Sequence, residues 1–374
     1  MKKLLSLLAV SLFVFSCTKK ANENEILIGS YSPNTGATAT FGVFQMRGID
    51  MAVEEINAAG GINGKKIKLI NYDNKSDNDE TLAVVNRLIS QDKVVAILGE
   101  ATSGRSKIGA QVAQQNKVPM LTSSATNPEV TKVGNFIFRA CFIDPFQGKV
   151  MAKFMVDTLK MKKAAVLRDV KEDYSVGLSD IFTAKLKEAG GEVVKDISYQ
   201  SGDIDFKSQL TAIKAANPEA IFVPGYYNEV ALIAKQLKEL GMTQVLLGGD
   251  GWSSPKLYEI AKEAINGNYF SNHYTTESTD PKTVAFVKKF KERYKEDADV
   301  MAALAYDSVY VLAEAIKNTK EPTSLNIRDE LAKIKDFAGV TGKMSMDENR
   351  DAVKSAVIVQ VQGNDYKFIT TVNP

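Results

Sequence analysis

The stretch MLTSSATNPE at Met120–Glu129 and the preceding loop GEATSGRS at Gly99–Ser106 decide the fold predicted for this chain. Each follows a short apolar run with strand character, VPML at Val118–Leu121 and VVAIL at Val94–Leu98, and each has a helical pattern behind it. This order is typical of a parallel sheet covered by helices. In such open α/β sheets, small ligands bind outside the carboxyl ends of the strands. The two loops therefore predict a binding site at one edge of a sheet.

Hydroxyl side chains gather in these loops, at Ser103, Ser124 and Thr126. Helix N-termini leave backbone N–H groups unpaired and carry positive dipole, and hydroxyls add further donors, which suits a small carboxylate. The alternative for each residue taken alone is that it only caps a helix, because Ser and Thr are preferred caps. Two such loops on neighbouring strands favour a site.

Predicted strands and helices alternate on both sides of these loops, beginning with a strand at Ile26–Tyr31. A similar cycle starts again at Phe146, and 374 residues exceed the usual size of a single core. We therefore predict two α/β lobes, each Rossmann-like. Polar and aromatic residues follow the strands of the second lobe, at Arg168, Asp169, Gly225–Tyr227 and Gly248–Trp252.

The composition excludes several classes of function. The 47 basic and 45 acidic residues create no strong field, so nucleic acid is not an expected partner. The single histidine, His273, removes the common zinc sites and the usual serine triad. The glycine cluster Gly60–Gly64 follows a predicted helix and precedes a strand, which is the wrong order for a dinucleotide site. We expect no enzymatic activity, no metal and no cofactor.

The first residues predict export and a lipid anchor. Lys2 and Lys3 precede an apolar segment too short to span a bilayer as a mature helix, so 1–16 is predicted to be a signal peptide. The segment ends in Val14–Cys17, VFSC, which resembles a bacterial lipobox and makes Cys17 the lipidated first residue. Residues 17–24 then form a polar tether at the membrane surface, outside the cytoplasm in the periplasm. The alternative is an ordinary secretory signal.

Motifs spread over nearly the whole mature chain resemble the type I periplasmic substrate-binding proteins of ABC transporters, in the branched-chain amino acid (Leu/Ile/Val) group. They are IGSYSPNTGATATFG, INAAGGINGKKIKLINYDN, MLTSSATNPE, VLRDVKEDYSVG, VPGYYNE and LLGGDGW, in the order of the family. The resemblance implies two lobes joined by a three-strand hinge, with the ligand in the cleft between them. It places lobe 1 at 25–143 plus 275–338 and lobe 2 at 144–272 plus 341–374, with crossings near Ile143–Pro145, Ser271–Thr275 and Gly339–Gly342.

The resemblance also implies roles for particular residues. The positions that hold the ligand's carboxylate fall on Ser103 and Thr126, with the backbone of Ser124 between them, and the position that often carries an acid for the ammonium falls on Asp250. The family commonly has Glu there, so the shorter Asp would stand back by about one methylene, and the alternative for Asp250 is a turn residue. The aromatic positions around the ligand fall on Phe41, Tyr174 and Tyr226. Apart from the resemblance, the only tryptophan, Trp252, is a further candidate for the pocket wall or for the interface between the lobes. For Trp252 a merely buried role is the alternative.

These expectations combine into a solute-binding protein, expected as a monomer, that captures a branched-chain or other aliphatic amino acid by lobe closure. Its partners would be the ligand and the permease subunits of an ABC importer, with the membrane contacted only through the lipid anchor. Two alternatives stay open. The ligand could be a related solute, such as an amide, a urea-like compound or an aromatic acid, and the protein could be a sensor that presents its ligand to a receptor.

Overall fold

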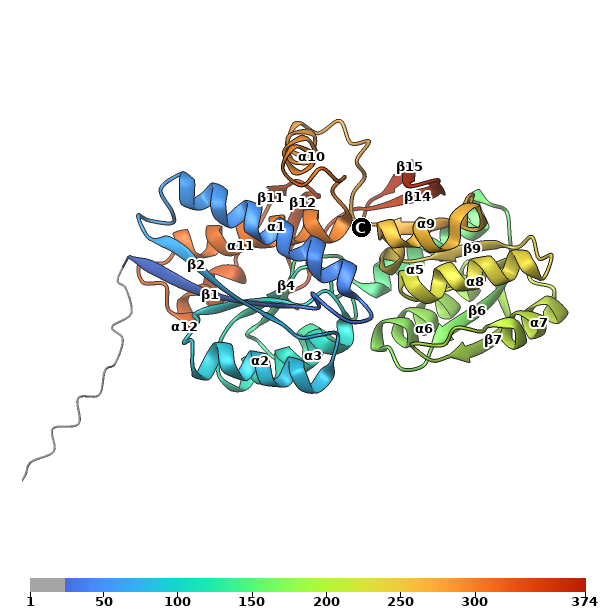
Figure 1. Ribbon diagram of the computed structural model, residues 1–374, viewed down its shortest axis with the longest axis horizontal. Helices are drawn as coiled ribbons and strands as arrows, with labels where there is room; N and C mark the ends of the chain where they lie inside the picture. Colours follow the sequence, from blue (N-terminus) through green and yellow to red (C-terminus); the bar gives the residue numbers. More distant parts are fainter. Residues whose placement is uncertain (1–23) are drawn as a thin grey trace, which may run out of the picture.

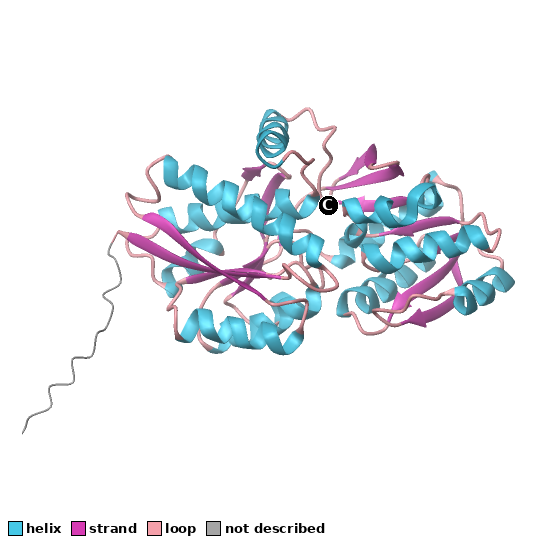
Figure 2. Ribbon diagram, in the orientation of Figure 1, coloured by secondary structure: helices cyan, strands magenta, loops and turns pink. Residues whose placement is uncertain are grey.

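A computed structural model describes residues 24–374 of the chain. The predicted signal peptide, Cys17 and most of the tether lie outside these residues. The described chain forms two lobes side by side, each with a layer of strands between helices (Figures 1 and 2).

Lobe 1 contains a parallel sheet of five strands in the order β2-β1-β3-β4-β5. Parallel pairing places the carboxyl ends of β3 and β4 side by side, with Gly99 opposite Thr122. The two polar loops that decide the fold therefore leave the sheet next to each other. The strands are β1 (Glu25–Ser32), β2 (Lys66–Asp73), β3 (Ala96–Gly99), β4 (Met120–Thr122) and β5 (Ile137–Arg139).

Helices cover both faces of this sheet, with α1 and α11 on one side and α2 and α3 on the other (Figure 1). Helices α1 and α11 pack so closely that a Cβ on Gly48 would lie 2.1 Å from the carbonyl oxygen of Ala302, so only glycine fits there. The helices are α1 (Ala39–Ala58), α2 (Asn78–Ser90), α3 (Ser103–Gln115), α4 (Glu129–Lys132), α10 (Pro281–Tyr294), α11 (Val300–Lys317) and α12 (Ser324–Leu331).

Lobe 2 contains a sheet of seven strands in the order β15-β14-β10-β9-β8-β6-β7. The strands from β10 to β7 are parallel, and the last two strands of the chain join antiparallel at one edge. The strands are β6 (Lys163–Asp169), β7 (Glu192–Tyr199), β8 (Ala220–Phe222), β9 (Val245–Gly248), β10 (Tyr269–Asn272), β14 (Ala356–Gln362) and β15 (Asp365–Val372). The helices are α5 (Asp144–Lys153), η1 (Phe154–Thr158), α6 (Asp173–Glu188), α7 (Lys207–Ala216), α8 (Tyr227–Glu239), η2 (Asp250–Trp252), α9 (Pro255–Ala261) and η3 (Lys262–Ile265).

The third crossing lies later in the chain than Gly339–Gly342, where the resemblance placed it. Residues 337–353 form a small antiparallel sheet of β11 (Phe337–Gly339), β12 (Gly342–Met346) and β13 (Ala352–Val353). This sheet stays on lobe 1, because Asp351 binds the fully buried Arg139 of β5 with an Oδ1 to Nε distance of 2.5 Å. The chain reaches lobe 2 only at Lys354 and Ser355, between β13 and β14. The boundary of lobe 2 at 341 was therefore too early.

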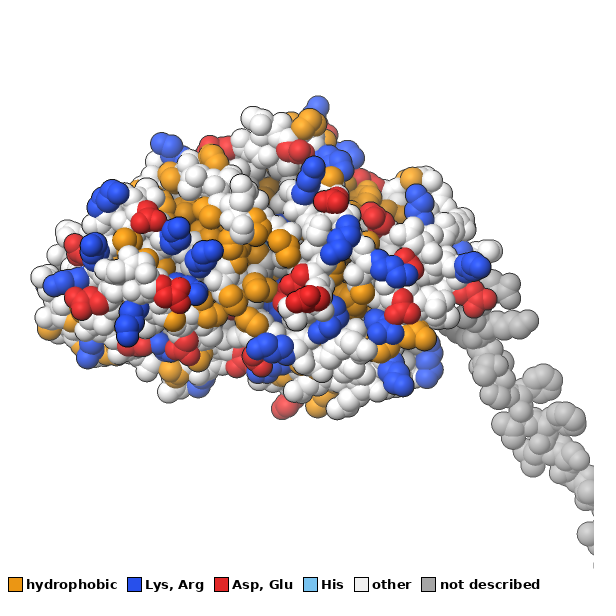
Figure 3. All heavy atoms as spheres, turned by 180° about the vertical axis from the view of Figure 1, so that it is seen from behind, with side chains coloured by type: hydrophobic (Ala, Val, Ile, Leu, Met, Phe, Trp, Pro, Cys, Tyr) orange, Lys and Arg blue, Asp and Glu red, His pale blue; other side chains and the backbone are white. Residues whose placement is uncertain are grey.

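The surface of the molecule mixes the two signs of charge. On the face seen in Figure 3, lysines and arginines alternate with acidic residues around a central region where hydrophobic side chains gather. None of the helices in residues 24–374 combines the length and the apolar character that a membrane crossing needs. Within the same residues, His, Cys, Asp and Glu nowhere form a group of three or more suited to a metal ion.

Candidate functional site

The wall of lobe 1 that faces lobe 2 is built from the two predicted loops. Ser103 is the first residue of α3, it is buried, and its Oγ accepts a hydrogen bond from the N–H of Asn127 at 3.2 Å. The hydroxyl of Ser124 donates to the carbonyl of Ala101 at 3.2 Å, which ties the two loops together. Thr126 is also buried, and its carbonyl accepts from the N–H of Asp144 at 3.0 Å. The structure thus brings all three predicted hydroxyl residues to one place.

The N-terminus of α3 offers this wall its positive dipole. Its first turn contains no acidic residue, so no side chain of that turn neutralises the dipole. Glu100, just before the helix, is bound at this helix end: its carboxylate accepts from Arg105 Nε at 2.7 Å and from the hydroxyl and N–H of Thr102, the N-cap residue. The charges of Glu100 and Arg105 are thus paired with each other, and lobe 1 presents hydroxyl donors and a helix N-terminus to the cleft.

The wall of lobe 2 is centred on Asp250, which is 3% exposed. Its Oδ1 accepts from the hydroxyl of Tyr174 at 3.1 Å, and its Oδ2 lies 3.0 Å from Nε2 of His273. Its own N–H donates to Oε1 of Gln147 at 2.9 Å. Across 24–374, neither lysine nor arginine forms an ion pair with Asp250. The carboxylate is therefore held by the side chains of Tyr174 and His273, and the backbone of the turn by Gln147, without a permanent cation beside it in the described chain.

Close packing explains the glycines on either side of Asp250. A Cβ on Gly249 would lie 2.4 Å from the hydroxyl of Tyr174, and one on Gly251 would lie 2.9 Å from the carbonyl oxygen of Gly225. The Gly-Gly-Asp-Gly sequence is therefore required by close packing at the cleft as well as by the turn.

Three aromatic side chains join the two walls. The rings of Tyr174 and Tyr226 stack with centroids 5.4 Å apart. The ring of Phe41, from lobe 1, and the ring of Tyr226 form an edge-to-face pair with centroids 5.6 Å apart. The hydroxyl of Tyr226 is buried and has no hydrogen-bond partner in the described chain. These rings supply an apolar surface that runs from Phe41 of lobe 1 to the Asp250 turn, where Tyr174 and Tyr226 lie beside Gly251.

Trp252 lies in the interior of lobe 2. It is fully buried, its Nε1 donates to the carbonyl of Val223 at 2.8 Å, and its ring packs against Phe270. It also fills the space next to Gly248, where a Cβ would lie 2.1 Å from the indole. This geometry matches the alternative stated for Trp252, a merely buried role. From inside lobe 2, the residue supports the turn that holds Asp250.

Sequence reasoning missed His273, Gln147 and Asp144. Burial lowers the pKa of His273 against the opposing effect of Asp250, so the ring is neutral near pH 7 and the Nε2–H tautomer suits the bond to Asp250. Burial, followed by the charge of Asp250, raises the pKa of Asp144 to about 7. Gln147 links the start of α5, the Asp250 turn and β10, because its side-chain amide contacts Asp144, Asp250 and Ser271. No local sequence signal marks these residues, since the bonds of His273 and Gln147 to Asp250 and Ser271 join residues 23 to 124 positions apart.

The lobes touch each other along the cleft. The side-chain amide of Asn127 donates to the carbonyl of Asp173 at 2.8 Å, and Lys107 forms an ion pair with the carboxylate of Asp173. Beside the aromatic residues, Asn228 donates to the carbonyl of Ala37 at 2.7 Å. The structure therefore shows the two lobes in a closed arrangement.

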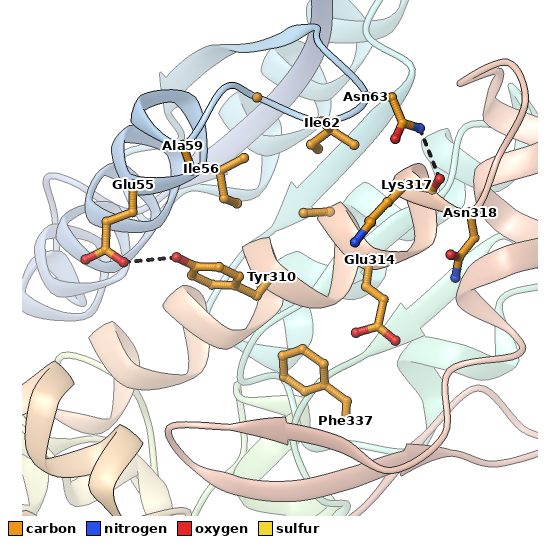
Figure 4. A pocket seen from close by; sticks show the side chains of 12 residues that line it. Glu55, Ile56, Ala59, Ile62, Asn63, Tyr310, Glu314, Lys317, Asn318 and Phe337 are labelled. Atoms are coloured by element: carbon orange, nitrogen blue, oxygen red, sulfur yellow. Dashed lines mark hydrogen bonds between the residues drawn. The ribbon is translucent and has the colours of Figure 1, made fainter.

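A hollow of about 550 Å³ on the outer side of lobe 1 is separate from this cleft (Figure 4). It lies between the end of α1 and α11, with Glu55 bound to the hydroxyl of Tyr310 and Asn63 bound to the carbonyl of Lys317. None of the predicted ligand-binding residues lines it.

The comparisons with known proteins agree with this architecture. The sequence model of the family described as "periplasmic binding protein" matches residues 25–366. The chain belongs to this family. The resemblance stated from the motifs and the predicted two-lobed α/β fold are thereby confirmed.

Individual periplasmic binding proteins resemble the chain over most of its length. A leucine-, isoleucine-, valine-, threonine- and alanine-binding protein of Pseudomonas aeruginosa is 31% identical over 327 residues, 87% of each chain. The crystal structure of a leucine binding protein from Thermotoga maritima is 40% identical, covers 93% of this chain and 99% of that one, and has a TM-score of 0.90. A branched-chain amino acid transporter substrate binding protein from Streptococcus pneumoniae, in complex with isoleucine, is 36% identical, covers 94% and 100%, and has a TM-score of 0.88.

Proposed function

We propose that this periplasmic binding protein captures a branched-chain or other aliphatic amino acid by closing its lobes, and delivers the ligand to an ABC importer. Binding is its whole task in this proposal, without a catalytic step. The names of its relatives in Pseudomonas aeruginosa, Thermotoga maritima and Streptococcus pneumoniae support the ligand class.

The observation that carries the proposal is the opposition of two unlike walls. Ser103, Ser124 and Thr126 offer donors and a helix N-terminus, which suit a carboxylate. Asp250 offers a buried carboxylate without an internal cation, which suits an ammonium group. The aromatic rings between them suit an aliphatic side chain. A zwitterion with an apolar side chain complements all three features, and it links the lobes because each lobe holds one of its charges.

A thermal-shift screen of the ligand-free protein tests the proposal. The panel contains the twenty amino acids together with carboxylates, amides, ureas and aromatic acids. A ligand that binds only the folded protein raises its stability by about 2.7 kcal/mol at one hundred times its Kd. We expect stabilisation by leucine, isoleucine or valine. Stabilisation only by solutes without an ammonium group would contradict the proposed ligand class while leaving a role in solute binding intact.

We also propose that Cys17 carries a lipid that holds the protein outside the cytoplasm at a membrane. The support is the VFSC sequence at the end of the apolar segment. Replacing the thiol in Cys17→Ser is expected to move the protein from the membrane fraction to the soluble fraction after cell fractionation. Equal membrane retention of the two forms would contradict lipidation.

A further inference from the structure

His273 stands where the chain leaves lobe 2. It directly follows β10, the last strand before the chain passes to α10 of lobe 1. It is the only histidine of the sequence, and its side chain is fully buried. Its backbone N–H donates to Oδ1 of Asn272 at 2.9 Å, which fixes the main chain at this point. The second crossing between the lobes therefore begins with a buried ring on an anchored backbone.

The ring of His273 contacts both the hinge and the binding wall. It stacks on Phe142 with centroids 3.6 Å apart and an angle of 21° between the ring planes. Phe142 lies between β5 of lobe 1 and α5 of lobe 2, where the chain makes its first crossing. The Nε2 atom of the same ring lies 3.0 Å from Oδ2 of Asp250. His273 thus joins two crossings of the hinge to the acid of the lobe 2 wall.

The second ring nitrogen shows that packing alone does not explain a histidine here. Nδ1 is buried and has no hydrogen-bond partner in the described chain. A buried polar atom without a partner is destabilising, so a phenylalanine would fill the same place more favourably. The nitrogen that does have a partner is Nε2, and this partner is Asp250. The bond to Asp250 is therefore what distinguishes histidine from phenylalanine at this position.

His273 and Tyr174 together orient the carboxylate of Asp250. The Tyr174 hydroxyl donates to Oδ1 at 3.1 Å, and Nε2 of His273 lies 3.0 Å from Oδ2. The torsion that turns an Asp carboxylate is soft, so two donors on different oxygens are needed to hold it in one orientation. An ionised carboxylate has about four lone-pair sites, so it can still accept from a ligand. The two side chains thus fix the direction of the acid without occupying it.

The charge of the ring matters as much as its position. The charged groups that act on it are Asp250 and, from the third crossing, Lys354. Burial lowers the pKa of His273 below its ordinary value of 6.5, Asp250 opposes this shift, and Lys354 adds to it. The ring is therefore neutral near pH 7. A neutral donor orients the carboxylate, whereas an imidazolium would form an internal ion pair that competes with an ammonium group.

We propose that His273 is a positioning residue for ligand capture, which sets amino acid affinity by holding the Asp250 carboxylate in its binding orientation. The inference rests on the proposed function, in which Asp250 binds the ammonium group. It adds a residue that acts through Asp250. Because the same ring stacks on Phe142, the direction of the acid is tied to the arrangement of the two crossings, so the hinge presents the acid to the ligand.

Isothermal titration calorimetry with leucine tests this role in two variants. His273→Phe keeps a ring on Phe142 and removes the donor, whereas His273→Gln removes the ring and keeps an N–H donor for Asp250. We expect His273→Phe to bind leucine at least about tenfold more weakly than the wild type, and His273→Gln to stay within about threefold of it. A residue needed only for packing predicts the opposite order. Equal affinity of the wild type and His273→Phe, or a larger loss in His273→Gln, would overturn the proposal.

The single histidine allows a second measurement on the unaltered protein. In protein that contains isotope-labelled histidine, nitrogen NMR spectra report which ring nitrogen carries the proton. We expect a neutral ring with its proton on Nε2 near pH 7, and a signal of this N–H that shifts when leucine saturates the cleft. A ring that titrates at the ordinary pKa of 6.5, or that does not respond to saturating leucine, would overturn the proposal. This result decides the matter if His273→Phe does not fold.

The two measurements also separate this inference from the proposed function. Leucine binding that is equal in the wild type and His273→Phe refutes the positioning role and leaves the proposed function intact. Absence of binding of leucine, isoleucine and valine to the wild type contradicts the proposed function, and the role of His273 with it. Weak binding by His273→Phe, near-normal binding by His273→Gln and a leucine-dependent Nε2–H signal together would establish the role.

Discussion

The two walls of the cleft hold their polar groups in different ways. On the lobe 1 wall, Ser103 and Ser124 are tied by bonds that join residues 24 and 23 positions apart, within two adjacent loops of one sheet edge. On the lobe 2 wall, Asp250 depends on Tyr174 and Gln147, which lie 76 and 103 positions away, and on the ring of His273. The first wall follows from local strand and loop patterns, whereas the second exists only after the lobe has folded.

The largest effect is expected from removing the acid of the lobe 2 wall. Asp250→Ala leaves the ligand's ammonium group buried without a partner, so amino acid affinity should fall by about 2 to 5 kcal/mol. Asp250→Asn, which keeps the shape and removes the charge, should lose most of the same amount. Calorimetric titration with the amino acid found in the screen measures both, and affinities within twofold of the wild type would remove Asp250 from the site.

The lobe 1 wall is tested by Ser103→Ala. Loss of one hydroxyl donor to a carboxylate should cost about 1.5 to 3 kcal/mol of binding free energy, less than the loss of Asp250, because backbone N–H groups and Thr126 remain. Ser106→Ala is the matched control, since the Ser106 hydroxyl donates to the carbonyl of Glu100 at 2.9 Å. The control should lower stability and leave affinity unchanged. Equal losses of affinity in the two variants would contradict a direct role for Ser103.

The pH dependence of binding reports on the lobe 2 wall. Asp144 has a pKa of about 7 in the free protein, and a bound ammonium group on the neighbouring Asp250 lowers it. Amino acid affinity should therefore rise by up to about tenfold from pH 6 to pH 8, the equivalent of one pKa unit. Asp144→Asn should flatten this profile. A wild-type affinity that falls from pH 6 to pH 8 would contradict the prediction that ligand binding lowers the pKa of Asp144.

The smallest effect distinguishes the two stacked tyrosines. Tyr174→Phe removes the donor to Asp250 Oδ1 and should weaken amino acid binding by about 1 kcal/mol, because the carboxylate is held less firmly. Tyr226→Phe removes a hydroxyl that has no partner in the described chain, so the free protein should be as stable as before. Chemical denaturation of both variants gives the comparison. A larger loss of stability in Tyr226→Phe than in Tyr174→Phe would contradict the assigned hydrogen bonds.

The fold was largely predictable because its signals are local. Alternating apolar runs and helical patterns marked the parallel sheets, and a residue type preferred at helix N-caps stands before α2, where Asp77 accepts from the N–H of Glu80 at 2.8 Å. The third crossing was placed wrongly because its position depends on Asp351 meeting the buried Arg139, a contact between residues 212 positions apart. Spacing and composition contain no signal for such a pair.

The site was predictable only in part, for the same reason. The hydroxyl residues follow strand ends directly, so the pattern pointed to them, and the resemblance pointed to Asp250. The sequence marked His273 only as a lone histidine, yet its ring stacks on Phe142 with centroids 3.6 Å apart and its Nε2 faces Asp250. The position of Trp252 inside lobe 2 was equally beyond local reasoning, because its indole Nε1 donates to the carbonyl of Val223, 29 positions away in the chain.

The most direct test of the two-wall account is a calorimetric comparison of leucine with two analogues of similar shape, 4-methylpentanoate without the ammonium group and isopentylamine without the carboxylate. The account predicts that each analogue binds the wild type at least about 30-fold more weakly than leucine, the equivalent of 2 kcal/mol or more. It also predicts that Asp250→Ala binds leucine and 4-methylpentanoate with similar affinity. Tight binding of 4-methylpentanoate by the wild type, equal to that of leucine, would contradict the account.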